Sequence, residues 1–290
     1  MPDTQILAVQ SRASNDLLDY RKGFIMDFSI YPKEFKFDLN DGVLTVTLNN
    51  PSQRNAIATH MDDILPRIFF EADHDQRVEI IVVTGEGQAF SAGGDLEGMK
   101  RNLEGIDNFL AGYRNGKRFM QLMLDTEKPI IAKVNGDAIG MGCTIALCCD
   151  IVIASETARF ADPHVRVGLA AGDGGAVFWS KNVGSALAKY FLLTGDMVSA
   201  REAQEMGLVA KVVAPDQLDA EVDRIVGKLR NNSMAAVRFS KSILNIPLRQ
   251  DLASMVDAGF ALESISSQLA DHIEAVHAFS EKRKPQFRKP

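Results

Sequence analysis

The chain has 290 residues, of which 46% are hydrophobic and 24% are charged, and these proportions are typical of a globular protein with a sizeable core. With 38 acidic residues against 32 basic ones, the net charge of −6 excludes a generally basic surface, so neither nucleic acid nor a membrane is expected as a partner. The sequence has no N-terminal apolar segment and no apolar run long enough to cross a bilayer, which predicts no signal peptide, no membrane span and a cytoplasmic location.

The first elements of the chain are an extension, a hairpin and a helix. Residues 1–30 show no sustained hydrophobic period and are interpreted as an N-terminal extension. Residues 35–39 and 43–48 alternate between apolar and polar residues around an Asn-Asp-Gly turn, which is typical of a β-hairpin. Apolar residues at helical spacing then predict a helix over 61–69.

Three short apolar runs predict fully buried strands. They are residues 80–83, 130–134 and 151–153, and helical segments lie between them, which predicts an α/β fold with parallel strands. Residues 101–124 have helical spacing with glycines at positions 112 and 116. Two interpretations of this segment remain open, a helix that covers a pocket and ordinary core packing.

The C-terminal part of the chain is predicted to be mostly helical. Ser199 and Glu202 have the spacing of a capping box, and a strand-like run follows at 208–213. From residue 216 onward the apolar positions keep helical spacing. We therefore expect a core over 31–215 and a helical region over 216–290.

Two glycine-bearing turns each follow a predicted strand, at residues 90–95 (FSAGGD) and 135–143 (NGDAIGMGC). Backbone N–H groups from two turns that face one point stabilise an oxyanion without any charged side chain. The turns are therefore candidates for an oxyanion hole.

The three cysteines, Cys143, Cys148 and Cys149, lie close together in one apolar stretch. Their spacing gives neither a disulfide framework nor a zinc site, and no metal site is predicted elsewhere. Buried, inert thiols are expected. The alternative is a nucleophilic Cys143 at a helix N-terminus, but no partner base lies near it in the sequence.

Four stretches, in their order and spacing, resemble the crotonase (enoyl-CoA hydratase/isomerase) superfamily from about residue 34 to the C-terminus. They are residues 48–56 (LNNPSQRNA), 90–96 (FSAGGDL), 134–150 (VNGDAIGMGCTIALCCD) and 281–285 (EKRKP). The resemblance implies a crotonase-like spiral of ββα units with a C-terminal helical subdomain. It also implies assembly as a homotrimer or homohexamer.

The resemblance assigns roles to residues in both turns. It implies that the backbone N–H groups of Gly94 and Met141 bind a thioester oxygen, although the family usually has glycine at the second position. It places Ala92 and Asp95 along the coenzyme A site and makes Arg54 a candidate for a phosphate contact. Basic residues near the C-terminus are open alternatives for that contact. Coenzyme A would enter as part of the substrate, with no separately bound cofactor.

The chain departs from the family where hydratases carry two catalytic glutamates, because these positions fall on Thr144 and His164. A threonine cannot titrate near neutral pH, whereas a histidine can act as an acid or a base. Asp173 lies nine residues after His164, close to where the dienoyl-CoA isomerases place a catalytic aspartate. An aspartate that hydrogen-bonds to a histidine fixes its tautomer and raises its basicity.

Structural interpretations of the same two residues stay open. Asp173 is also a candidate helix N-cap, and His164 a core histidine paired with Asp162 or Arg166. The remaining histidines are predicted to lie on the surface, and they are His60, His74, His272 and His277.

The leading hypothesis is an acyl-CoA-processing enzyme of the enoyl-CoA hydratase/isomerase type, a lyase or isomerase such as fatty acid metabolism uses, with His164 and Asp173 as acid/base groups. The alternative is a cyclic β-diketone hydrolase, because the superfamily's carbon–carbon bond hydrolases have a similar histidine–aspartate spacing. The retained thioester-site pattern at 91–95 argues against it. A third hypothesis is a non-catalytic acyl-CoA-binding protein.

Overall fold

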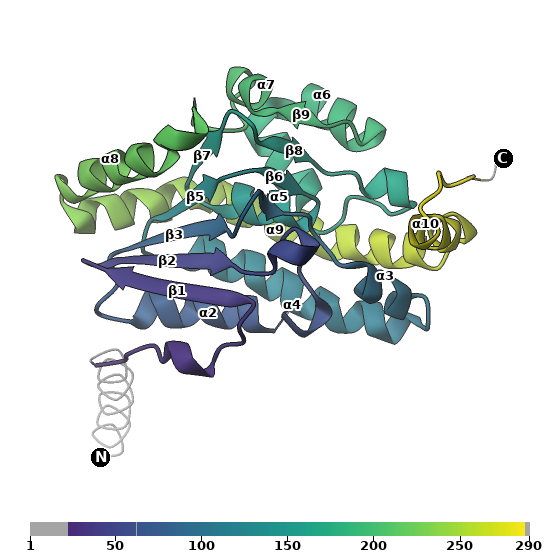
Figure 1. Cartoon of the computed structure of the whole chain (residues 1–290), viewed down its shortest axis with the longest axis horizontal. Coiled ribbons are helices and arrows are strands. Elements are labelled where there is room, and N and C mark those ends of the chain that lie inside the picture. The colour runs from purple at the N-terminus through teal and green to yellow at the C-terminus, as the bar shows by residue number, and fades with distance from the viewer. Residues whose placement is uncertain (1–22, 62, 288–290) are drawn as a thin grey trace, which may run out of the picture.

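The strands form two sheets in the computed structural model, which describes residues 23–61 and 63–287 (Figure 1). The larger sheet contains, in spatial order, β1 (Phe35–Asn40), β2 (Val43–Leu48), β3 (Ile80–Gly85), β5 (Ile130–Val134), β7 (Ile151–Ser155) and β10 (Lys211–Val213). The smaller sheet contains β4 (Ala89–Ser91), β6 (Asp137–Ile139), β8 (Arg159–Ala161) and β9 (Val198–Ser199).

Parallel pairing dominates both sheets. The predicted hairpin is present as the antiparallel pair β1–β2, and β2, β3, β5, β7 and β10 then pair in parallel. In the smaller sheet β4, β6 and β8 are parallel, and β9 closes the edge in the antiparallel sense. The three predicted buried strands are confirmed, although β10 is shorter than the strand-like run at 208–213.

Three consecutive units send their first strand to the larger sheet and their second to the smaller one. The strand pairs are β3 with β4, β5 with β6, and β7 with β8, and helical segments follow each pair. This repeated arrangement confirms the predicted spiral of ββα units.

Nine α-helices are present in the described ranges. They are α2 (Ile64–His74), α3 (Leu96–Asn102), α4 (Ile106–Asp125), α5 (Met141–Cys148), α6 (Gly175–Thr194), α7 (Ala200–Glu205), α8 (Leu218–Arg230), α9 (Met234–Ser267) and α10 (Ala270–Ser280). The predicted capping box is formed at the start of α7. None of the helices in the described part of the chain has the length and apolar character that crossing a bilayer requires.

The C-terminal helices are in contact with the strands as well as with one another. Leu218, Val222 and Val226 of α8 pack against Ile80 and Ile131 of the larger sheet. Helix α9 extends across the molecule from α8 to α10 (Figure 1). The chain after residue 215 is mostly helical, as expected, but α8 packs directly on the larger sheet. A domain boundary at this position stays a prediction.

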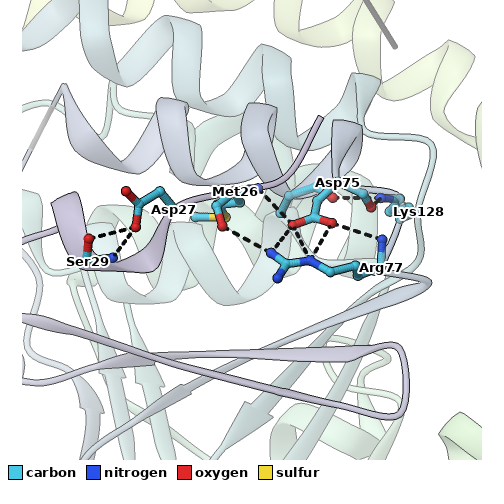
Figure 2. A network of polar contacts seen from close by, with 7 residues as sticks. Met26, Asp27, Ser29, Asp75, Arg77 and Lys128 are labelled. Atoms are coloured by element: carbon cyan, nitrogen blue, oxygen red, sulfur yellow. Dashed lines mark hydrogen bonds and ion pairs between the residues drawn. The ribbon is translucent and has the colours of Figure 1, made fainter. Parts of the chain in front are cut away.

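The described end of the predicted extension is held against the core by a polar network (Figure 2). The N–H of Met26 donates to Asp75 Oδ2 at 2.9 Å, and its carbonyl accepts from Arg77 Nη2 at 3.0 Å. Arg77 Nη2 also binds Asp75 Oδ2 at 2.6 Å, and Lys128 Nζ donates to the carbonyl of Asp75 at 2.6 Å. Residues 23–30 are thus attached to the core, whereas 1–22 lie outside the described residues.

Candidate active site

The candidate site lies where three neighbouring strands of the smaller sheet end. Strands β4, β6 and β8 are parallel, so the loops that follow them leave the same edge of the sheet. Gly94 lies in the loop after β4, Met141 begins the helix after β6, and His164 lies in the loop after β8. Residues separated by as many as 70 positions therefore meet at one edge because of the repeated topology.

The first two loops make a close backbone contact at Gly93, whose φ is 86°. A Cβ atom on residue 93 would lie 2.6 Å from the carbonyl oxygen of Ile139 and 3.3 Å from the nitrogen of Met141. Only glycine tolerates this conformation together with this approach. Gly93 therefore brings the two predicted oxyanion-hole turns together.

The backbone N–H groups of Gly94 and Met141 are free to bind a ligand. In the described ranges neither group has a hydrogen-bond acceptor, although the neighbouring N–H groups of Gly93 and Asp95 are both paired. Met141 is the first residue of α5, where helix geometry leaves N–H groups unpaired. Gly94 is exposed and Met141 is half-buried, so a ligand oxygen can reach both donors.

Both residues line a cavity of about 230 Å³, and four of the other predicted site residues line it too. These are Ala92, Asp95, His164 and Asp173. Arg54 is not among the lining residues, because its guanidinium binds Asp137 Oδ2 at 2.7 Å. Its phosphate contact stays a prediction.

His164 is surrounded by three carboxyl groups. It begins a 3₁₀ turn (His164–Val167), and its Nδ1 makes a short contact with Oδ1 of Asp162. Its Nε2 lies 3.5 Å from Asp173 Oδ2 and 3.8 Å from Glu263 Oε1. The structure thus brings His164 and Asp173 together and pairs the histidine with Asp162, whereas Arg166 binds Asp196 instead.

These charges set the protonation states of the cluster. Burial alone would lower the pKa of His164, but the carboxylates of Asp162 and Asp173 outweigh burial and hold that pKa well above its usual value. Burial raises the pKa of Asp173, against the opposing charge of His164. Burial likewise raises the pKa of Glu263, to about 8. His164 is therefore an imidazolium near neutral pH, and one or more carboxyl groups beside it hold a proton.

The hydrogen bonds at the start of α6 do not support Asp173 as its N-cap. The N-cap residue of α6 is Gly174, and no side-chain cap hydrogen bond is made there. Asp173 directs Oδ2 to His164, and its Oδ1 has no hydrogen-bond partner among the described residues. The carboxyl group therefore belongs to the cavity cluster.

Two titratable residues of the cavity lining were not predicted as site residues from the sequence, Glu263 and His272. Glu263 comes from the buried face of α9, where Phe260 and Ser267 lie one turn to either side. An acidic residue at a core position of an amphipathic helix was the available signal. The prediction that His272 lies on the surface is wrong, because α10 packs over the 3₁₀ turn and His272 Nδ1 donates to the carbonyl of Val167 at 2.6 Å.

Thr144, which stands where the family's hydratases have a glutamate, and its neighbour Cys143 are both buried in α5. Thr144 is buried in α5, and its side chain is not part of the cavity lining. Cys143 is also buried, and burial raises the pKa of its thiol well above the usual value. The inert-thiol interpretation therefore holds for Cys143, and the nucleophilic alternative does not.

Three side chains, His164 among them, also have the geometry of a metal site. Asp162, His164 and Asp173 each offer one ligand-type atom, and these atoms lie within 4.8 Å of one another, the only such group in the described ranges. Carboxylate oxygens and imidazole nitrogens suit several divalent cations. The sequence predicted no metal, and the chemistry proposed below requires none.

A second cavity of about 150 Å³ continues from the first. The two share Asn102, Phe109, Met141, Asp173 and Glu263 in their linings. The rest of the second cavity is formed mainly by α4, which contributes the residues 112, 113, 115, 116 and 119. Helix α4 thus both covers a pocket and packs into the core, so the two interpretations of this segment are combined.

Comparisons with known proteins point to one family. Residues 38–290 match the family model for enoyl-CoA hydratase/isomerase. A short-chain-enoyl-CoA hydratase of Clostridium acetobutylicum is 37% identical over 247 residues, which cover 83% of this chain and 92% of that protein. The crystal structure of an enoyl-CoA hydratase/isomerase from Mycobacterium paratuberculosis matches with a TM-score of 0.82 and 33% identity, over 86% of this chain and 99% of that one.

A β-diketone hydrolase from the cyanobacterium Anabaena, bound to (S)-3-oxocyclohexyl acetic acid, matches with a TM-score of 0.74. It is 25% identical, and the match covers 82% of this chain and 98% of that one.

Proposed function

The chain belongs to the enoyl-CoA hydratase/isomerase family and is an enzyme of that type, and we propose that it adds water to the double bond of an enoyl-CoA thioester. The observation that carries the proposal is the pair of unpartnered N–H groups of Gly94 and Met141, which line the same cavity as His164 and Asp173.

The two N–H groups would bind the carbonyl oxygen of the thioester. When a nucleophile adds at Cβ, the electrons of the double bond move toward that oxygen, which becomes an enolate oxyanion. Each fixed donor in such a hole lowers the barrier by about 3 kcal/mol. Because both donors are backbone groups, this part of the mechanism does not depend on the missing glutamates.

Asp173 would act as the base that activates water, and His164 as a fixed positive charge beside it. An imidazolium whose Nδ1 is held by Asp162 is a poor base, but it stabilises the ionised form of Asp173. The usual two-glutamate mechanism is replaced by an aspartate that approaches from the start of α6.

The test is hydration of crotonyl-CoA by the wild type, by Asp173→Asn and by His164→Ala. We expect Asp173→Asn to lower kcat by about 100-fold or more while KM changes little, because positioned acid/base groups contribute factors of this size. If both variants hydrate crotonyl-CoA as fast as the wild type, the assignment of Asp173 and His164 is overturned. Asp271→Asn on the neighbouring helix α10 is the control, since Asp271 does not line the cavity.

Hydrolysis of a cyclic β-diketone is the second candidate. It is favoured by the His164–Asp173 contact together with the likeness to the Anabaena hydrolase. Cleavage of a cyclic 1,3-diketone without coenzyme A, with no turnover of enoyl-CoA thioesters, would decide for it. A non-catalytic acyl-CoA-binding protein is disfavoured, because the similar proteins are named as enzymes.

We also propose that coenzyme A is bound only as part of the substrate, along Ala92 and Asp95, which line the same cavity. Assembly as a homotrimer or homohexamer and a cytoplasmic location complete the proposal. Nucleic acid and membranes are not among the partners expected for an acidic chain.

A further inference from the structure

Glu263 is a buried carboxyl group that the mechanism above does not use. It lies on α9, is 5% exposed and lines both cavities at the point where they meet. Its Oε1 is 3.8 Å from Nε2 of His164, the same nitrogen that Asp173 approaches to 3.5 Å. Two carboxyl groups, one from the loop before α6 and one from α9, therefore face one imidazole.

The backbone is built to bring these two carboxyl groups together. A Cβ atom on residue 172 would lie 2.3 Å from the carbonyl oxygen of Gly259 and 2.9 Å from Cβ of Glu263. A Cβ atom on residue 259 would in turn lie 2.8 Å from the carbonyl oxygen of Gly172. The loop that carries Asp173 and the helix that carries Glu263 therefore cross with backbone against backbone, which only a pair of glycines permits.

No structural hydrogen bond accounts for the burial of this carboxyl group. Among the described residues Glu263 Oε2 has no partner, and neither has Oδ1 of Asp173. A buried polar atom without a partner costs about 1–3 kcal/mol, and such atoms occur where a ligand or reaction uses them. The other buried glutamate of a C-terminal helix, Glu221, is by contrast held by Arg224 and Lys211.

We propose that Glu263 is the general acid of the hydration reaction and protonates Cα of the enolate, while Asp173 takes the proton from water. This inference rests on the proposed function and completes it. The site would then use two carboxyl groups, as the family's hydratases do, but from different positions of the chain.

The atoms balance over one turnover. Asp173 removes a proton from water, the water oxygen bonds to Cβ, and the π electrons move to the thioester oxygen, where Gly94 and Met141 donate to it. The enolate then takes the proton of Glu263 at Cα. Asp173 ends protonated and Glu263 ionised, and transfer of one proton between them restores the site, with one water added to the substrate.

The protonation states of the surrounding groups agree with this division of roles. The groups that face Glu263 are His164, Asp162 and Asp173, and His272 also lines the cavity. Burial raises the pKa of Glu263 to about 8, so the acid form dominates at neutral pH. His272 is neutral there, because burial lowers its pKa.

The experiment compares Glu263→Gln with Glu221→Gln, a matched buried glutamate outside the cavity. For Glu263→Gln we expect kcat for crotonyl-CoA hydration to fall about 100-fold or more, with KM within about threefold. The wild-type rate should fall as pH rises through about 8, where Glu263 ionises, and this alkaline limb should be lost in the variant's residual activity. Glu221→Gln should retain both the rate and the limb.

The readout at Cα separates catalysis from structure. In D₂O, the wild type should replace the Cα proton of the hydrated product with deuterium. The Glu263→Gln variant should lose this exchange, while its thermal stability stays unchanged. Glu263→Asp, which moves the carboxyl group back by one methylene, should restore part of the rate if the glutamine variant folds poorly. Hydration by Glu263→Gln within about threefold of wild type, or persistence of the alkaline limb, would overturn the proposal. Absence of any enoyl-CoA turnover in the wild type would instead overturn the proposed function itself.

Discussion

Asp75 carries a full carboxylate with no exposed surface, and its environment explains why this is tolerated. Burial alone would raise its pKa, but hydrogen bonds from the Arg77 side chain and from the N–H groups of Arg77 and Met26 hold the pKa below its usual value. Replacing the carboxylate by an amide would leave one acceptor oxygen and would turn the other acceptor into an NH2 group that faces these donors. Asp75 is thus one of the residues that link residues 23–30 to the core.

We expect Asp75→Asn to lower the free energy of unfolding by about 2 kcal/mol. This is less than breaking a fully buried ion pair costs, because the partly exposed Arg77 is screened by water. The pKa of Asp75 is depressed in the folded state, so its contribution is present above pH 3.8 and is lost as pH falls through the folded value. Urea unfolding at pH 7 measures the change. The exposed Asp219, paired with Lys133, provides the control Asp219→Asn, and an equal effect of the two substitutions would contradict the expectation.

At the scale of elements, the strands and helices of this chain were largely predictable, because periodicity reports which face of an element is buried. The hairpin, the three buried strands and the capping box of α7 follow from local pattern and turn chemistry. The crossing of Gly172 and Gly259 was not predictable, since it depends on the path of α9 across the molecule. For the same reason Glu263 was missed and His272 was misplaced on the surface.

Helix α4 offers a test of how an element shapes the site. At Gly116 a Cβ atom would lie 3.0 Å from the Phe260 ring, so the missing side chain leaves room for the second cavity. We expect Gly116→Val to lower kcat/KM for enoyl-CoAs longer than crotonyl-CoA by about 10-fold or more, with a smaller effect on crotonyl-CoA, because filling a pocket discriminates by chain length. Competition assays with a mixture of chain lengths measure the ratio.

Gly227→Val is the control for this substitution, since that helix glycine has no atom within 4 Å of its Cβ position. A chain-length ratio that is unchanged in Gly116→Val, or changed equally in both variants, would show that the second cavity does not receive the acyl chain.

At the scale of the whole molecule, large apolar side chains remain exposed on two helices, α6 and α9. Leu193 of α6 and Leu244 of α9 are each 72% exposed, and Phe239 is 70% exposed. Large apolar side chains that stay exposed on a single chain are candidates for protein–protein contact surfaces. They support the proposal that several copies of the chain assemble.

We expect light scattering to give the mass of three or six chains at micromolar concentration. The double substitution Leu193→Lys and Leu244→Lys should shift the mass toward a single chain, because each charge would be buried without a partner in the contact. Replacing the exposed Lys36, on the opposite edge strand β1, by glutamine serves as the control. A wild-type mass of one chain would contradict the assembly.

The contact at Gly93 has an evolutionary consequence. Every residue except proline keeps its peptide N–H, so a substitution at Met141 or beside it leaves the donor in place. The groups that move protons are side chains, and a single codon change replaces any of them. A lineage can therefore exchange one reaction for another while the proposed pair of backbone donors persists. Position 93 is where this pair is vulnerable, because any residue with a Cβ would separate the two turns.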